Sequence, residues 1–192
     1  GLYTAEGIEY ALSHFGIIPH IRRLGFEQVH AAIDVVDMGD RVRVMGNALG
    51  KQHVLVECML ERRRVVERDV LYVHWLALCN PRARFSEKRP QLPGQEVPGL
   101  GLAREIGWAL ARIARRLGLE GVAYRPAWYH TAYSGRYHFV FADSRRQGRF
   151  EAMQRDLRDI PLIEVTRAAA EGRLRNHGER CTWEAEEMVF WL

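Results

Sequence analysis

A glycine-rich turn that runs directly into a helical pattern is the part of the chain best suited to bind a charged ligand. Residues 95–104 read Gln-Glu-Val-Pro-Gly-Leu-Gly-Leu-Ala-Arg, and Gly99 and Gly101 keep this backbone free of bulky side chains. The first turn of a helix presents main-chain N–H groups without partners and the positive end of the helix dipole, so it can hold a diphosphate. The same residues also suit a plain turn into a helix, and both interpretations stay open.

The helix that follows this turn is indicated by the spacing of its apolar residues. They recur at steps of 4, 4, 3 and 4 positions: Leu102, Ile106, Leu110, Ile113 and Leu117. This spacing places them on one face of an α-helix, and Gly118 is a natural terminator for it. Before the helix, proline and glycine dominate residues 81–101, which predicts a surface loop.

Two short helices and four strands are predicted ahead of that loop. Ile8, Leu12 and Phe15 have helical spacing, and Pro19 begins a second helix through Leu24. Alternating apolar residues then predict four strands: 29–35, 42–47, 54–60 and 70–78. The third strand is expected to end at the charged stretch 61–69. Short connections make the four strands an antiparallel meander, and the fourth, apolar on both faces apart from His74, is expected to be central.

The second half of the chain alternates helices and strands. The patterns predict a strand at 122–124, a short helix at 127–133, a strand at 137–141, helices near 146–158 and 162–174, and a last strand or docked tail at 188–192. The expected fold class is therefore α/β, of the α+β type. We expect one domain over residues 1–192, with an antiparallel meander, a helix-strand-helix-strand unit and extra C-terminal helices.

The order of these elements over about residues 28–141 resembles the GNAT superfamily of acyl-CoA-dependent N-acyltransferases. The family's turn has the pattern Gln/Arg-x-x-Gly-x-Gly/Ala, which here falls on Glu96, Gly99 and Gly101, with Gln95 one position earlier. Residues 127–139, Ala-Trp-Tyr-His-Thr-Ala-Tyr-Ser-Gly-Arg-Tyr-His-Phe, are similar to the segment in which a Tyr-bearing helix precedes a Gly-Phe strand. The resemblance implies a GNAT-like central mixed sheet.

The resemblance also implies a reaction and a cofactor site. An acyl group, expected to be acetyl, would pass from acetyl-CoA or another acyl-CoA to the amine of a small molecule or a protein. Main-chain amides of Gly99 to Ala103 would hold the diphosphate, while a backbone contact from Leu76 to Leu78 would meet a carbonyl oxygen of the ligand. The implied cofactor-binding residues are Leu76, Leu78, Val97, Gly99, Leu100, Gly101, Leu102 and Ala103.

Three residues are candidates for catalysis under this resemblance. Tyr133 occupies the position of the family's general acid, where a phenol would reprotonate the coenzyme A thiolate. His74 and Glu57 are polar residues in otherwise apolar strands, and either would take the proton from the amine. Each has a structural alternative: Tyr133 as an aromatic anchor of its helix, and His74 and Glu57 as hydrogen-bonded or edge-exposed residues.

Charge leaves two other functions open. The chain has 28 Lys and Arg against 24 Asp and Glu, and only Lys51 and Lys88 are lysines. Arginine suits phosphate, although genomic base composition also produces such a bias. A nucleic-acid-binding module would use basic residues and stacking aromatics: Arg62–Arg64, Arg82, Arg84, Arg145, Arg146, Arg149, Trp128, Tyr129 and Tyr133. A non-catalytic ligand-sensing or interaction domain is the other alternative.

Several absences complete these expectations. No apolar run reaches the length of a membrane span and no secretory pattern is visible, so we expect a cytoplasmic protein without a membrane partner. The three cysteines are widely spaced and flanked by apolar residues, which is typical of small core residues rather than disulfides. No metal-binding spacing occurs, and no metal is expected. The apolar stretch 183–192 needs cover from the core or from a second copy in a homodimer.

Overall fold

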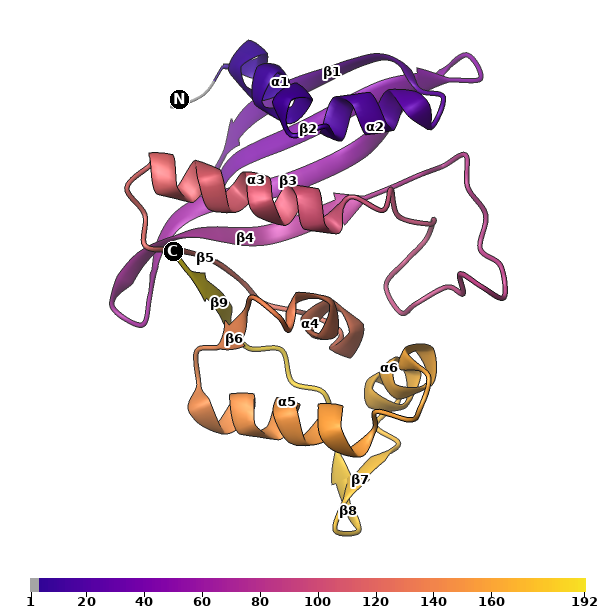
Figure 1. Cartoon of the computed structure of the whole chain (residues 1–192), viewed down its shortest axis with the longest axis vertical. Helices are drawn as coiled ribbons and strands as arrows, with labels where there is room; N and C mark the ends of the chain where they lie inside the picture. Colours follow the sequence, from indigo (N-terminus) through magenta and orange to yellow (C-terminus); the bar gives the residue numbers. More distant parts are fainter. Residues whose placement is uncertain (1–3) are drawn as a thin grey trace. The chain divides into compact units, whose positions relative to one another are not determined.

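The computed structural model describes residues 4–192, which form a mixed α/β fold with six helices, nine strands and a multi-stranded mixed sheet (Figure 1). These residues divide into two compact units. Unit 1 contains residues 4–84, 97–122 and 192, and unit 2 contains residues 85–96 and 123–191. The single domain expected from the sequence stays a prediction.

Unit 1 is built on an antiparallel meander of four strands, as the short connections predict. These strands are β1 (Glu27–Val36), β2 (Gly39–Ala48), β3 (Lys51–Val65) and β4 (Arg68–Leu78). In β3 and β4, Cys58 pairs with Leu76 and Val56 pairs with Leu78. Side chains alternate between the two faces of a strand, so these four lie on the same face of the sheet.

The charged stretch 61–69 does not close β3, which corrects the expected end of that strand. β3 continues to Val65, and the chain turns at Val66 and Glu67, both with positive φ. The arginines extend the strand because β4 pairs with them, and the guanidinium carbon of Arg63 lies 4.6 Å from the ring centroid of Tyr72. Cross-strand pairing, which the charge pattern does not reveal, therefore sets the length of β3.

Three helices of unit 1 cover one face of the meander (Figure 1). They are α1 (Ala5–His14), α2 (Ile17–Arg23) and α3 (Ala103–Arg116). The predicted apolar face of α3 is buried at Ile106 and Leu110, 5% and 7% exposed. Burying a side chain of this size stabilises the fold by roughly 1.5–3 kcal/mol, so these contacts fix α3 on the sheet.

Unit 2 combines short strands with three helices. β5 (Gly121–Tyr124) begins in unit 1 and leads into α4 (Tyr129–Gly135), β6 (Val140–Phe141), α5 (Ser144–Asp156), α6 (Leu162–Ala170), β7 (Leu174–Asn176), β8 (Glu179–Cys181) and β9 (Met188–Trp191). β6 and β9 pair antiparallel, so the chain's end is a strand. The core of this unit includes Tyr129, Phe141 and Phe150, with Trp183 in T-shaped contact with all three rings.

Two predictions for unit 2 are wrong in extent. The strand expected at 137–141 shortens to Val140 and Phe141, and the last helix ends at Ala170 rather than near 174. The hairpin β7–β8 follows instead, with His177 and Gly178 both at positive φ between its strands. Two positive-φ residues are typical of the tightest hairpin turns, and Gly178 was the local signal for this one.

Candidate functional site

The glycine-rich turn between β4 and α3 is held in place by contacts within unit 1. Asn80 donates its backbone N–H to the carbonyl oxygen of Pro98 at 2.7 Å. The side chains of Leu100 and Leu102 are buried, and the carbonyl oxygen of Leu100 lies 3.0 Å from Nε2 of His20 in α2. The turn is therefore anchored by its leucines and its carbonyl groups.

The two glycines of this turn are needed for different reasons. A Cβ atom on Gly99 would lie 3.3 Å from the carbonyl oxygen of Leu78, because the turn passes close to the end of β4. Gly101 has a φ of 75°, in the left-handed region that favours glycine, and a Cβ atom there would meet nothing within 4 Å. The space beside Gly101 is thus open to a ligand.

The first turn of α3 offers main-chain donors that no protein group uses. Among residues 4–192, no acceptor receives the N–H groups of the segment 101–104. The N-cap residue Leu102 provides no side-chain cap, and the first amide of the helix that donates to a backbone carbonyl is that of Ile106, to the oxygen of Leu102 at 3.0 Å. This is the arrangement of a helix start that can bind an anion.

A carboxylate lies one residue after these donors, in the same helical turn. Glu105 is in the first turn of α3, and a hydrogen bond with its own backbone N–H is the main reason that its pKa is lowered. A smaller contribution comes from the guanidinium of Arg104, whose Nη2 lies 3.1 Å from Oε1 of Glu105. The ionised Glu105 side chain offsets part of the helix dipole, so an incoming anion must compete with it.

His74 is part of a polar pair in unit 1. The β3–β4 register passes from Leu60 with Val73 to Met59 with Trp75, so His74 is the extra residue of a β-bulge. Its Nε2 atom lies 2.7 Å from Oε2 of Glu61, a partner that sequence reasoning missed because strand register creates it. The structure therefore brings His74 to Glu61.

Glu57 lies elsewhere on the same two strands. It is half-buried on β3 and pairs in register with Arg43 of β2 and Ala77 of β4. Of the implied cofactor-binding residues, the structure brings Leu78 against Gly99, while Leu76 is 39% exposed and Val97 is half-buried. Glu57 is therefore a second candidate base on the sheet. Its partner on β4, Ala77, follows His74 by three residues.

Tyr133 lies in unit 2, half-buried on α4. The guanidinium carbon of Arg136 lies 3.7 Å from the centroid of its ring, and the ring of Tyr129 is 5.9 Å away. Its hydroxyl group has no hydrogen-bond partner within residues 4–192. In the neighbouring Tyr129, burial raises the pKa to about 12, so that phenol keeps its proton. The ring of Tyr133 therefore packs against its neighbours, as expected for an aromatic residue that anchors its helix. Its hydroxyl group is not engaged by these contacts.

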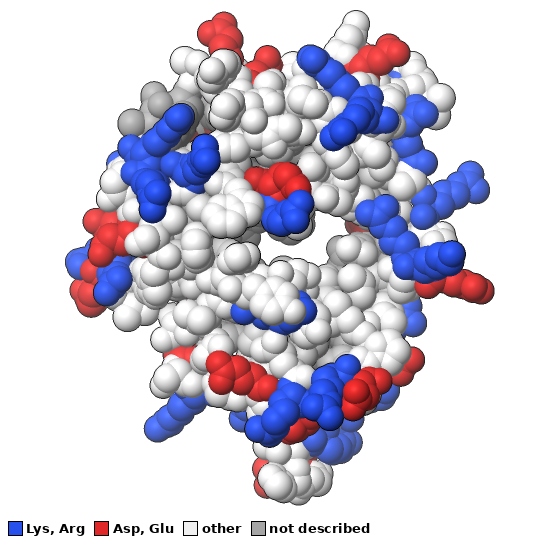
Figure 2. Space-filling model, in the orientation of Figure 1, with Lys and Arg blue, Asp and Glu red and all other residues white. Residues whose placement is uncertain are grey.

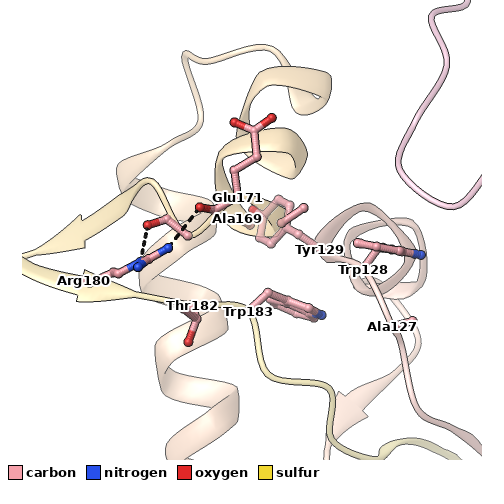
Figure 3. A pocket seen from close by; sticks show the side chains of 10 residues that line it. Ala127, Trp128, Tyr129, Ala169, Glu171, Arg180, Thr182 and Trp183 are labelled. Atoms are coloured by element: carbon pink, nitrogen blue, oxygen red, sulfur yellow. Dashed lines mark hydrogen bonds between the residues drawn. The ribbon is translucent and has the colours of Figure 1, made fainter.

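Unit 2 also contains a small pocket of about 200 Å³ (Figure 3). Trp128, Tyr129 and Trp183 line one part of it, and Glu171 and Arg180 line another. The guanidinium of Arg180 donates to the carbonyl oxygen of Gly172 at 2.8 Å and to that of Glu171 at 3.3 Å. Arg180, placed by the β7–β8 hairpin, thus satisfies carbonyl groups at the end of α6.

The structure also bears on metal binding, on disulfides and on membrane crossing. Within residues 4–192, no three His, Cys, Asp or Glu side chains are arranged to hold a metal ion. Cys58, Cys79 and Cys181 form no disulfide with one another. No helix in the described part of the chain has the length and apolar character that crossing a membrane requires.

Among residues 4–192, unit 1 thus offers a helix start with unpaired amides and a His-carboxylate pair on the sheet, and unit 2 by itself offers a tyrosine whose hydroxyl has no hydrogen-bond partner. His20, Glu61 and Glu105 belong to these arrangements but had no signal in the sequence, because each depends on contacts that folding creates. Comparison of the chain with protein-family models, with curated proteins and with solved structures finds no match.

Proposed function

We propose that unit 1 binds the diphosphate of an acyl-coenzyme A at the start of α3, and that the chain transfers the acyl group to an amine. The observation that carries the proposal is the set of unpaired amides at 101–104, next to the open space at Gly101. The order of elements, a meander followed by a helix, a strand, a helix and a strand, adds support through its resemblance to the GNAT superfamily. Acetyl-CoA is the first ligand to test.

The proposed chemistry assigns a proton transfer to each polar candidate. The amine loses a proton to His74 or Glu57 and attacks the thioester carbonyl, and the C–S bond then breaks as the coenzyme A thiolate takes up a proton. Tyr133 is proposed as the donor of that proton on the resemblance to the GNAT superfamily alone. If His74 donates from Nε2 to Glu61, its Nδ1 atom is left with a lone pair for the proton of the amine. Glu61 is then a positioning residue that fixes the tautomer of His74.

Nucleic-acid binding receives less support from the same residues. Tyr129 is only 3% exposed, so its ring cannot stack on a base, and Arg146 is paired with Glu184 and Glu186. On the face displayed in Figure 2, acidic side chains lie among the basic ones, so the basic side chains do not form one continuous patch. A non-catalytic ligand-sensing or interaction domain is the other alternative, and it would bind neither acetyl-CoA nor nucleic acid.

Calorimetry with acetyl-CoA tests the proposed binding site through its charge. Glu105→Gln removes the carboxylate from the amides and is expected to tighten binding, while Ala103→Asp adds a competing carboxylate at an exposed position and weakens it. Each change is expected to be roughly two- to fivefold, since a charge at a helix end contributes about 0.3–1 kcal/mol.

Glu67→Gln is the matched control. It removes the same charge at the exposed turn between β3 and β4, at the other end of β4 from Leu78, and leaves the affinity unchanged. Absence of heat at millimolar acetyl-CoA would refute the proposal, and so would equal affinities for all three variants. Binding of oligonucleotides with a steep salt dependence, in place of acetyl-CoA, would favour the nucleic-acid alternative.

A further inference from the structure

Unit 1 contains a cavity of about 640 Å³ whose lining residues come from α1, α3 and the four strands of the meander. Its volume falls in the range of small-molecule pockets. Most of its lining is apolar and includes Leu12, Val44, Val56, Ile106 and Leu110. No residue of the glycine-rich turn lines it, so this cavity is distinct from the proposed diphosphate site, although Glu61 of the proposed acyl-transfer chemistry is part of its lining.

The cavity exists because small residues face it from both helices. α1 contributes Gly7 and Ala11, and α3 contributes Ala109. Protein interiors are otherwise packed about as densely as organic crystals, and a space of this size forgoes the contacts that larger side chains would make. On the floor, burial raises the pKa of the Cys58 thiol to about 12, so this group stays neutral and adds no charge to the lining.

Three arginines also line the cavity: Arg62, Arg112 and Arg116. None of them forms an ion pair with another residue between 4 and 192. Two acidic residues, Asp40 and Glu61, share the lining, and Glu61 is already bonded to His74 at 2.7 Å. The lining therefore carries more positive than negative charge, and within residues 4–192 its arginines have no carboxylate partner. The guanidinium carbon of Arg112 does lie 5.5 Å from the ring centroid of Phe15, another lining residue.

The structure places two of these arginines at the same end of the cavity. Arg62 pairs in register with Leu71, near the start of β4. Just beyond the end of α3, the backbone N–H of Glu120 donates to the carbonyl oxygen of Asp69 at 2.8 Å, which brings that end of α3 to the start of β4. Arg116 is the last residue of α3, and Arg112 precedes it by about one turn. The cavity thus combines an apolar body with a basic end.

We propose that this cavity binds a fatty acid, with the aliphatic chain between α1, α3 and the sheet and the carboxylate paired with Arg62, Arg112 and Arg116. A saturated chain fills a long apolar space without leaving polar groups unpaired. A carboxylate accepts two parallel hydrogen bonds from a guanidinium, which makes arginine its preferred partner. The proposal does not depend on acyl transfer or on the site at α3's start.

Calorimetry with saturated fatty acids of 8 to 14 carbons, kept below their micelle concentrations, tests the apolar part. The affinity is expected to rise by up to about fourfold for each added methylene until the cavity is full. Gly7→Leu fills the space from α1, and a Cβ atom at Gly7 meets only Oγ1 of Thr4, at 3.4 Å. We expect this variant to lose at least about tenfold in affinity for dodecanoate. Gly148→Leu, an exposed helical position of unit 2 with no atom within 4 Å of its Cβ, is the matched control and binds as the native chain does.

The basic end is tested with the double variant Arg112→Gln/Arg116→Gln. Both residues are exposed, so folding is retained, and dodecanoate is expected to bind about tenfold more weakly because charge-assisted hydrogen bonds are lost. Dodecanol, which has the same chain without the charge, binds the double variant and the native chain equally.

Four results would overturn the proposal. The first is the absence of saturable binding of any fatty acid, and the second is equal dodecanoate affinity of Gly7→Leu and Gly148→Leu. The third is an equal loss of affinity for dodecanol and dodecanoate in the arginine variant. The fourth is light scattering that shows a dimer which Gly7→Leu dissociates. The last result would assign the cavity to contact with a second copy. Because the arginine variant leaves the apolar lining intact, the charge test stands even if Gly7→Leu fails to fold. A failure of acetyl-CoA binding leaves this result unaffected.

Discussion

His20 of α2 and Leu100 of the glycine-rich turn are joined by a hydrogen bond between positions 80 residues apart, with Nε2 of His20 3.0 Å from the carbonyl oxygen of Leu100. A carbonyl oxygen only accepts, so the bond requires the proton of His20 to be on Nε2. The contact fixes the turn from the side of α2, and the free amides at 101–104 begin one residue later. The orientation of the proposed anion site therefore depends on this bond.

Replacement of His20 by phenylalanine tests that dependence. His20→Phe retains a ring but leaves the Leu100 carbonyl without its donor, and we expect the free energy of unfolding to fall by about 1–2 kcal/mol. Acetyl-CoA binding is expected to weaken as well. His53→Phe is the control, because the half-buried His53 ring packs 6.4 Å from that of Phe26 without a hydrogen bond to another described residue. Equal effects of the two variants in urea unfolding would show that the bond contributes nothing.

Two glycines of the same segment are expected to respond to alanine with opposite signs. Gly101→Ala forces a Cβ atom into the left-handed region and costs about 1–2 kcal/mol, although nothing crowds it. Gly107→Ala, inside α3 and equally uncrowded, stabilises the protein by roughly 0.5–1 kcal/mol, since alanine loses less backbone entropy in a helix. Urea denaturation measures both changes, and a gain in stability for Gly101→Ala would contradict the strained conformation.

The parts of the fold that sequence predicts well are those set by local periodicity. The apolar steps from Leu102 to Leu117 place α3 almost to the residue, and alternation finds all four strands of the meander. The extension of β3 to Val65 was missed because it depends on pairing with β4, which a charged sequence does not display. The β7–β8 hairpin was missed because the helical pattern was extended to about residue 174, and the turn at His177 and Gly178 was not interpreted as part of a hairpin.

The site shows the same division between local and distant causes. Gly99 and Gly101 can be chosen as candidates from the sequence, because glycine before a helix allows a close backbone approach and a positive φ. His20 and Glu61 act through partners in other elements, and no spacing in the sequence connects them. The cavity is harder still to foresee, because it depends on how the small residues of two helices face each other.

Tyr133→Phe separates catalysis from packing. The hydroxyl group has no hydrogen-bond partner among residues 4–192, so its loss is expected to change stability by less than about 0.5 kcal/mol. If Tyr133 is the general acid, turnover of acetyl-CoA with an amine falls at least about a hundredfold while the affinity for acetyl-CoA is retained. Tyr137→Phe, which removes an exposed hydroxyl bonded to Arg136, is the matched control. Turnover equal to that of the native chain would leave Tyr133 with a packing role alone.

The thiol of Cys58 is expected to be protected by the fold. Burial raises its pKa to about 12, and the thiolate is the reactive form, so both access and ionisation oppose modification. In the variant Cys79→Ser/Cys181→Ser, where Cys58 is the remaining thiol, Ellman's reagent at pH 8 is expected to react only as fast as the protein unfolds. Urea should restore rapid reaction. A fast reaction in native buffer would mean that solvent reaches the cavity floor.

His130 gives the stability of unit 2 a pH dependence whose sign follows from its burial. Burial lowers the pKa of His130 below 6.5, and its Nδ1 atom is buried without a hydrogen-bond partner among the described residues. As the pH falls through 6.5, the unfolded chain takes up a proton at this position before the folded chain does, so stability is lost on the acidic side and retained above it. Replacement by phenylalanine removes this linkage. We therefore expect His130→Phe to gain stability relative to the native chain between pH 7 and pH 5.5 in urea unfolding, and a difference that stays constant over this range would show that His130 titrates equally in both states.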